Sequence, residues 1–271
     1  MRPYKISVVI PTYKPQDYVW TCLDSLYRQT LSKSDFEVII VLNGCDEPWK
    51  TEILDYIGSN IGDMNVKFIH TDKGGVSHAR NLGLQQALGK FVAFIDDDDY
   101  VSPRYLESLL EKSGANTVVL SNTIAVHDES MTSSISYVLP SVYKEYHKCN
   151  NINLNSQVRK YFSGPCMKLL PLSAIGIRRF DIRFKNGEDS LFMFLISDKI
   201  KKVCFAGEDA VYYRRFRNGS AVTSYRSLKS KFINSLKIIL QYSKIYWSSP
   251  LNYNFIFYIT RVLGAVRSIF S

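Results

Sequence analysis

Four consecutive aspartates, Asp96–Asp99, stand between the apolar run Phe91–Ile95 and Pro103 in the stretch FVAFIDDDDYVSP. Carboxylates this close repel one another and raise one another's pKa unless a cation neutralises them. Mg²⁺ and Mn²⁺ prefer such oxygen ligands, and proteins often hold them with one or two carboxylates plus the phosphates of a substrate. The cluster therefore predicts a divalent-cation site that carries a diphosphate. The simpler alternative is an acidic turn that begins the next helix.

A second acidic pair, Glu188 and Asp189, lies in the stretch KNGEDSLF. A carboxylate opposite a departing diphosphate can accept the proton of an attacking hydroxyl group. Such an attack displaces the diphosphate directly and inverts the carbon that is attacked. The alternative is that both acids only favour the start of a helix, where the helix dipole attracts negative charge. The two interpretations are compatible.

The elements that must position these acids alternate between strand and helix over the first half of the chain. Short β-branched, apolar runs predict strands at Lys5–Ile10, Phe36–Leu42, Val66–His70, Phe91–Ile95 and Thr117–Val126. Helical periodicity and Pro103 predict helices at Gln16–Thr30, Pro48–Ile57, Val76–Leu88 and Arg104–Lys112. This order predicts an α/β fold, a Rossmann-like, mostly parallel sheet with helices on both faces.

Ligands of such sheets bind beyond the carboxyl ends of the strands, where the strand order reverses. If the first strand lies beside the fourth, that crevice lies between Pro11–Tyr13 and Asp96–Asp99. Later in the chain, Met131–Gln157 is polar and predicts an irregular insertion, regular signals return at Pro165–Leu172, and Asp189–Ile200 predicts a helix.

The net charge of +9 comes from the carboxyl-terminal part of the chain, because residues 210–271 hold ten Lys or Arg and no Asp or Glu. Leu228–Trp247 predicts an amphipathic helix with a cationic face formed by Lys231, Asn234, Lys237, Gln241 and Lys244, and with Phe232, Leu236 and Ile239 on another side. Leu251–Phe270 is aromatic, with Phe255, Phe257 and Phe270, but Arg261 and Arg267 argue against a spanning helix. This tail predicts attachment to an anionic membrane surface. The alternative is a pair of helices packed on the domain or on a second subunit.

Five stretches in order give a resemblance to the family 2 glycosyltransferases, which have a GT-A fold. They are VVIPTYK (Val8–Lys14), GGVSHARNLGL (Gly74–Leu84), FIDDDDYVSP, KNGEDSLF (Lys185–Phe192) and VYYRRFRNGSAVTS (Val211–Ser224). The resemblance covers roughly residues 4–224. It implies a catalytic domain over residues 1–224, with a nucleotide-sugar half at about 1–127 and an acceptor half at about 128–224. Residues 225–271 form the tail.

The resemblance also implies residue roles. Asp98 and Asp96 are expected to bind Mn²⁺ or Mg²⁺, Asp189 to act as the general base, and Glu188 to support it. Nucleotide contacts are expected from Pro11, Thr12, Tyr13, Asn43, Arg80, Asp96 and Asp97. Asp99, Arg214 and Arg215 are candidate helpers for phosphate or metal; the alternative for the arginines is solvated surface charge.

The chain departs from the family pattern at VLNGCDEP (Val41–Pro48), because many members end this strand with Val-Asp-Asp-Gly-Ser. Leu42 and Asn43 stand where the two acids would be. The Asn43 amide can donate and accept hydrogen bonds, so it is a candidate reader of the base. Asn43-Gly44 is equally compatible with a plain turn.

The expected function is metal-dependent, inverting transfer of a hexosyl or N-acetylhexosaminyl group from a nucleotide-diphosphate sugar, with a UDP-sugar as the expected donor. The expected acceptor is a saccharide, plausibly lipid-linked, in cell-surface polysaccharide synthesis. The expected location is cytoplasmic, on the inner face of the cell membrane.

Three rivals remain. A sugar-nucleotide nucleotidyltransferase would carry a Gly-rich, basic loop after the first strand, where this chain has PTYKPQ. A nucleic-acid-binding protein would carry excess positive charge on its body, but residues 1–209 balance at −1. A catalytically inactive binding module is disfavoured because Asp96, Asp98, Asp99 and Asp189 are all present.

Overall fold

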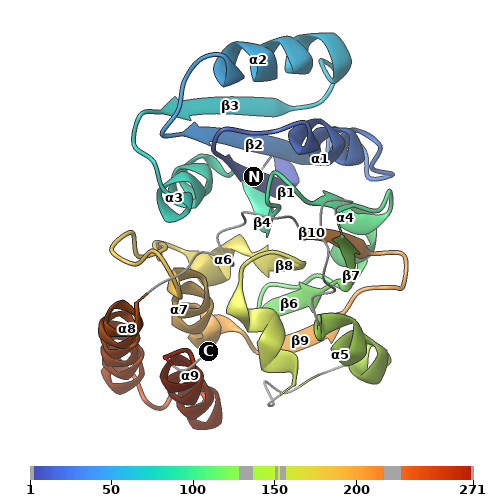
Figure 1. Ribbon diagram of the computed structural model, residues 1–271. Helices are drawn as coiled ribbons and strands as arrows, with labels where there is room; N and C mark the ends of the chain where they lie inside the picture. Colours follow the sequence, from blue (N-terminus) through green and yellow to red (C-terminus); the bar gives the residue numbers. More distant parts are fainter. Residues whose placement is uncertain (1–2, 128–136, 150–151, 153–156, 217–226, 270–271) are drawn as a thin grey trace.

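The structure is a computed structural model that describes residues 3–127, 137–149, 152, 157–216 and 227–269. Its centre is a seven-stranded sheet with the strand order β3-β2-β1-β4-β8-β6-β9 (Figure 1). The strands are β1 (Tyr4–Thr12), β2 (Phe36–Asn43), β3 (Val66–Thr71), β4 (Gly89–Phe94), β6 (Thr117–Leu120), β8 (Lys168–Pro171) and β9 (Lys202–Phe205). Only β8 runs antiparallel to its neighbours. This confirms the predicted α/β class with a mostly parallel sheet.

The first strand does lie beside the fourth, since β1 pairs with β4 on one edge and with β2 on the other, both in parallel. The order reverses here, because β2 and β3 continue in one direction from β1 while β4 lies in the other. Both β1 and β2 are almost wholly buried, which explains their continuous apolar runs. The reversal of strand order expected beside the carboxyl ends of β1 and β4 is therefore present, and this is where parallel sheets of this kind bind ligands.

Helices connect these strands. The helices of the first half are α1 (Tyr18–Tyr27), α2 (Trp49–Asn60), α3 (Val76–Gln86) and α4 (Tyr105–Glu111). Those of the second half are α5 (Leu139–Tyr146), α6 (Leu172–Ile175), α7 (Glu188–Leu195), α8 (Leu228–Ser248) and α9 (Phe255–Arg267), with 3₁₀ turns at Val158–Ser163 and Ser197–Lys199. The predicted helix Asp189–Ile200 is thus shorter than expected and ends in a 3₁₀ turn.

The single strand predicted at Thr117–Val126 is wrong. The chain forms β6 and then β7 (Asn122–His127), which belong to different sheets. Ser121 separates them, because its backbone N–H donates to the Met167 carbonyl while that of Asn122 donates to the Ala210 carbonyl. As a result, β7 joins β10 (Val211–Phe216) and β5 (Tyr100–Val101) in a separate three-stranded sheet.

The irregular insertion predicted at Met131–Gln157 is also wrong in part, because it contains α5. Leu139, Val142 and Tyr143 recur at helical spacing and all three are buried, which fixes the helix against the body. Residues 131–136, 150–151 and 153–156 of the predicted insertion lie outside the described residues.

The tail forms the predicted helix α8 and a second helix, α9, which lie beside each other and beside α7 (Figure 1). Ile238 and Tyr242 of α8 and Phe257 of α9 belong to the same hydrophobic core as the sheet. Phe257 was expected to reach lipid, but its ring packs edge-on against Phe162 instead. Within the described residues, no helix combines the length and the apolar character that crossing a bilayer requires. Since Ile238, Tyr242 and Phe257 lie in the core, the inner face of the tail is part of the folded domain.

Replacing Phe257 by alanine should test this. Phe257 is 0% exposed, so Phe257→Ala removes a whole aromatic side chain from the core and should lower the free energy of unfolding by about 3–5 kcal/mol. Chemical denaturation measures the change. The matched control is Phe255→Ala two residues earlier, 55% exposed, which should change stability by no more than about 0.5 kcal/mol. Equal, small effects of both variants would mean that α9 is a detachable appendage.

Candidate active site

The aspartates follow β4 and meet the end of β1, as the strand order requires. The Thr12 hydroxyl donates to Asp97 Oδ2 at 2.5 Å, which links the two strand ends. Pro11 and Thr12 are buried in β1, while Tyr13 just beyond them is exposed. The structure thus brings the predicted nucleotide residues Pro11, Thr12 and Asp97 together at one edge of the sheet.

The four aspartates have different surroundings. Asp96, Asp97 and Asp98 are half-buried, whereas Asp99 is buried. The Tyr212 hydroxyl donates to Asp99 Oδ2 at 2.6 Å and accepts a hydrogen bond from the backbone N–H of Asp96 at 3.3 Å. Burial, followed by the charges of Asp96 and Asp98, raises the pKa of Asp99 well above its usual range. Asp99 therefore holds the shape of the cluster from its buried side, while Asp96 and Asp98 remain partly accessible to solvent.

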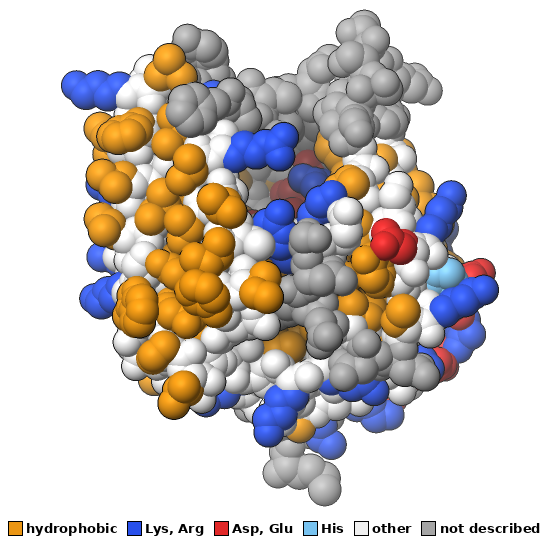
Figure 2. Space-filling model, turned by 90° about the horizontal axis from the view of Figure 1, so that it is seen from below, with side chains coloured by type: hydrophobic (Ala, Val, Ile, Leu, Met, Phe, Trp, Pro, Cys, Tyr) orange, Lys and Arg blue, Asp and Glu red, His pale blue; other side chains and the backbone are white. Residues whose placement is uncertain are grey.

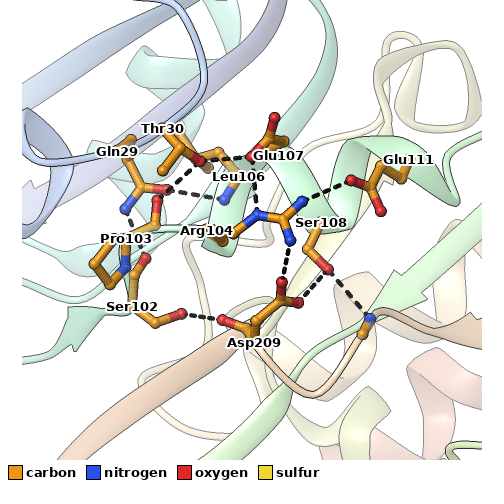
Figure 3. Close-up of polar contacts among 11 residues, drawn as sticks. Gln29, Thr30, Ser102, Pro103, Arg104, Leu106, Glu107, Ser108, Glu111 and Asp209 are labelled. Atoms are coloured by element: carbon orange, nitrogen blue, oxygen red, sulfur yellow. Dashed lines mark hydrogen bonds and ion pairs between the residues drawn. The ribbon is translucent and has the colours of Figure 1, made fainter.

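Strand β10 delivers Tyr212, and a polar network holds the start of that strand in place (Figure 3). Asp209, just before β10, accepts hydrogen bonds from Arg104 Nη1 at 2.7 Å and from the Ser108 hydroxyl at 2.8 Å. The Ser102 hydroxyl donates to the Asp209 carbonyl and accepts from the backbone N–H of Val211. The network ties β10 to the segment that follows the aspartates, so Tyr212 and Asp99 are held in register.

Arg80 joins the aspartate cluster to the predicted base. Its side chain is only 4% exposed, and its Nη2 donates to Asp96 Oδ1 at 2.9 Å while its Nη1 donates to Asp189 Oδ1 at 2.6 Å. Arg80 was predicted beside the nucleotide, and its closest described partners are these two carboxylates. One guanidinium therefore places Asp96 and Asp189 next to each other, although 93 positions separate them in the sequence.

The next residue of the same helix also reaches the second half of the chain. The Asn81 side-chain amide donates to the Phe180 carbonyl at 2.9 Å and accepts from the Phe180 backbone N–H at 2.8 Å. The Phe180 ring stacks on Phe192 of α7 with ring centroids 3.8 Å apart. Asn81 thus anchors α7, the helix that carries Asp189, against α3.

Asp189 lies in the first turn of α7, next to the buried Glu188. Burial raises the pKa of Asp189, and Arg80 beside it opposes that rise. Gly187 before the helix has φ of 82°, and a Cβ there would lie 2.4 Å from Ile238 Cδ1 of α8. The tail helix therefore packs directly on the turn that aims Asp189.

The loops that follow β1, β2 and β3 meet around Asn43. Asn43 is buried; its amide donates to the Thr12 carbonyl at 2.7 Å, and its Oδ1 accepts from the Gly75 backbone N–H at 2.8 Å. Gly44 has φ of 68°, and a Cβ there would lie 2.7 Å from the Gly74 Cα. The Asn43 amide thus ties the loops together, which favours the turn interpretation over base reading.

Two of the predicted phosphate arginines lie near the site. The backbone N–H of Arg215 donates to Asp99 Oδ1 at 2.7 Å, its Nε donates to the Asp98 carbonyl at 3.1 Å, and its guanidinium lies over the Tyr18 ring. The Arg214 guanidinium instead lies near the rings of Tyr137 and Phe216. A phosphate role for either stays a prediction. Arg217, a third arginine of the same stretch for which a phosphate contact is also expected, lies outside the described residues.

Lys168 is a site neighbour that the sequence reasoning missed. It is 1% exposed, and its ammonium donates to the carbonyls of Gly164 and Cys166, each at 2.6 Å. Burial lowers the pKa of Lys168 to about 7, while the charge of Asp189 opposes that change. A lysine within the apolar run CMKLLP was the available signal. Tyr212 is the other residue that the sequence reasoning missed. It lies in β10 (VYYRRF), where side chains point alternately to the two faces of the strand, and it is buried.

The residues present fit a divalent cation that takes part of its shell from a substrate. Among the described residues, no group of three or more His, Cys, Asp or Glu side chains is arranged to hold a metal alone. Asp96 and Asp98 supply two half-buried carboxylates just beyond the carboxyl end of β4, and Mg²⁺ is commonly bound by one or two carboxylates plus phosphate oxygens.

Replacing Tyr212 by phenylalanine should weaken the cluster. The variant leaves buried Asp99 without one of its two hydrogen-bond donors, so the free energy of unfolding at neutral pH should fall by about 1–3 kcal/mol. The Tyr212 bond favours charged Asp99, so the loss should shrink as the pH falls and Asp99 becomes protonated in both proteins. Denaturant titrations at several pH values measure this. The control is Tyr213→Phe, whose ring stacks on Tyr100; an equal loss there would argue against the Asp99 contact.

Comparison with known proteins identifies the family of the chain. The family model described as glycosyl transferase family 2 matches residues 7–167, which is more than half of the chain. The minor teichoic acid biosynthesis protein GgaB of Bacillus subtilis is 27% identical over 245 residues, which cover 86% of this chain and 25% of that protein. The poly(ribitol-phosphate) beta-N-acetylglucosaminyltransferase TarS of Staphylococcus aureus is 26% identical over 87% of this chain and 40% of that protein. The chain thus spans less than half the length of these two relatives.

The fold is shared with a solved structure of S. aureus TarS residues 1–349 in complex with UDP-GlcNAc. The TM-score is 0.74 at 22% identity, with 98% of this chain and 72% of that chain covered. A mannosyltransferase of Pyrobaculum calidifontis, in complex with GDP-Man and Mn²⁺, matches with a TM-score of 0.57 at 13% identity over 97% of this chain and 73% of that one. These likenesses confirm the GT-A fold. Together with the family match over residues 7–167, they establish that the chain belongs to glycosyl transferase family 2.

Proposed function

We propose that the protein transfers a sugar from a nucleotide-diphosphate donor to a hydroxyl group of a saccharide acceptor, with inversion at the anomeric carbon. The observation that carries the proposal is the shared contact of Arg80 with Asp96 and Asp189. It sets a carboxylate suited to a metal and diphosphate beside a second carboxylate suited to an acceptor hydroxyl. These are the two charged groups that direct displacement at a sugar carbon needs.

In the proposed mechanism, Thr12, Tyr13 and the loop held by Asn43 bind the nucleoside at the carboxyl end of β1. Asp98 and Asp96 would hold Mn²⁺ or Mg²⁺, which would neutralise the charge that develops on the departing diphosphate. Asp189 accepts the proton of the acceptor hydroxyl at one of its carboxylate oxygens as that hydroxyl attacks the anomeric carbon. Arg80 keeps Asp189 oriented and favours its charged form.

The comparisons support the choice of substrates. TarS was solved with UDP-GlcNAc and with UDP, so a UDP-sugar carrying a hexosyl or N-acetylhexosaminyl group is the proposed donor. The mannosyltransferase complex with Mn²⁺ supports the proposed metal. GgaB and TarS are named for teichoic acid or poly(ribitol-phosphate), which supports a saccharide or polyol-phosphate polymer as acceptor. We further propose that the acceptor is lipid-linked and that the enzyme works at the cytoplasmic face of the membrane.

Two substitutions should separate the two carboxylate roles. Asp98→Asn should abolish the Mn²⁺-dependent part of UDP binding, because a metal ligand is lost. Asp189→Asn should keep UDP binding within about twofold and reduce transfer at least about 100-fold, because general-base catalysis contributes 10²–10⁴-fold. Calorimetry measures the first, and release of UDP from UDP-sugars in the presence of acceptor measures the second. UDP affinity lost equally in both variants would move Asp189 to the nucleotide site and sink the assignment.

The acid side of the pH profile should depend on Arg80. Transfer requires charged Asp189, so activity is present above the Asp189 pKa and is lost as the pH falls through it. Arg80 lowers that pKa against the effect of burial, so Arg80→Gln should move the acid limb of kcat to higher pH, and Arg80→Lys should move it less. The control is Arg178→Gln, which breaks an ion pair with Asp198, whose side chain is 7% exposed, away from the site. An acid limb that stays in place while turnover falls would contradict the account.

A further inference from the structure

The outer face of the tail remains apolar after the fold is complete. On α8, Leu228, Phe232, Leu236 and Leu240 recur every four residues and are 48–68% exposed, so they form one stripe along the helix. On α9, beside it, Ile256, Leu263 and Val266 are also exposed. At the end of this helix pair, Trp247 and Leu251 are 68% and 99% exposed. We define these residues, together with Ile233 and Phe255, as the outer tail face.

Figure 2 shows apolar side chains gathered over the part of the surface that α8 and α9 form in Figure 1, with Lys and Arg side chains around the edge. Soluble monomers rarely expose such contiguous apolar fields unless the field binds something. The inner faces of both helices are already occupied by the core. The outer tail face is therefore available to a partner outside the domain.

The charge around the outer tail face limits what that partner can be. Residues 228–269 contain four lysines and two arginines and no acidic residue. At the amino end of α8, Lys229, Lys237 and Arg183 line a groove of about 380 Å³ that also contains Ile233. A second copy of the same face would bring like charges opposite one another. A partner surface that has an apolar interior and negative charge at its boundary would be complementary to the outer tail face.

We propose that the outer tail face lies on the surface of a membrane that contains anionic lipid. The apolar stripe enters the boundary between headgroups and acyl chains, Trp247 lies at the interface, and the groove with Lys229 and Lys237 receives a lipid phosphate. This inference deepens the proposed function by naming the surface that meets the membrane. Because α8 also packs on the turn before Glu188 and Asp189, the attached enzyme has its proposed base one helix away from the bilayer.

The test is sedimentation of the full chain with vesicles, which needs neither donor nor acceptor, so it can fail while the transferase assignment stands. Vesicles of equal parts phosphatidylglycerol and phosphatidylcholine should bind the protein at least about tenfold more tightly than pure phosphatidylcholine, and high salt should narrow this difference. The double variant Leu236→Glu and Leu240→Glu should lose about tenfold or more in binding. The double variant Lys229→Gln and Lys237→Gln should mainly reduce the part of vesicle binding that high salt removes.

The control is Leu54→Glu, the same type of substitution at a single leucine that is 44% exposed on α2, at the opposite end of the molecule (Figure 1). It should bind vesicles as the unmodified chain does. Circular dichroism checks that every variant stays folded, which the exposure of the substituted residues favours. Equal binding to neutral and anionic vesicles, or undiminished binding by the Leu236/Leu240 double variant, would overturn the proposal. A third result would also overturn it: the unmodified chain dimerises with rising concentration, does not bind vesicles, and no longer dimerises when Leu236 and Leu240 are replaced. The outer tail face would then bind a second copy of the chain.

Discussion

The buried ion pair network of Arg80 is the constraint on which the rest of the structure depends. A guanidinium that is almost fully removed from water needs compensating negative charge, and here Asp96 and Asp189 supply it. Removing one partner of such a buried network typically costs several kcal/mol, because the remaining charge is left uncompensated. The same network that the fold needs for stability therefore fixes the distance between the two carboxylates that the proposed reaction needs.

Each element around the site can be understood as support for that network. The β1–β4 pairing brings the aspartates beside the end of β1, and α3 supplies Arg80 and, through Asn81, holds the segment that carries Phe180. Strand β10 secures the aspartates from behind through Tyr212, and α8 packs against the turn before Asp189. The first and second halves of the chain are thus joined by direct contacts of α3, and the tail belongs to this assembly through its inner face.

The sequence predicted the parts of this arrangement that local pattern controls. Continuous apolar runs gave β1, β2 and β4, because strands buried on both faces need no polar positions. The aspartates and Asp189 stood out because charge at the end of a buried strand or at a helix start has few explanations. The break at Ser121 could not be predicted, since it depends on carbonyls of Met167 and Ala210 that are far away in the sequence.

Burial of charged and aromatic side chains was equally out of reach. Nothing local distinguishes Asp99 from Asp98, or Phe257 from Phe255; the difference arises from Tyr212 in one case and from the packing against Phe162 in the other. The apolar run around Lys168 hints at its burial, but only the fold shows that its ammonium donates to the carbonyls of Gly164 and Cys166. These features come from tertiary contacts, and only the assembled fold contains them.

The central contact of the account, between Arg80 and Asp189, can be measured without knowing the acceptor. A double-mutant cycle of Arg80→Gln and Asp189→Asn on the free energy of unfolding, at pH 7, isolates the interaction between the two side chains. Direct contact predicts a coupling energy of about 0.5–3 kcal/mol, with the double variant less destabilised than the sum of the two single variants. Effects that add within about 0.3 kcal/mol would show that the two residues act independently and would contradict the account.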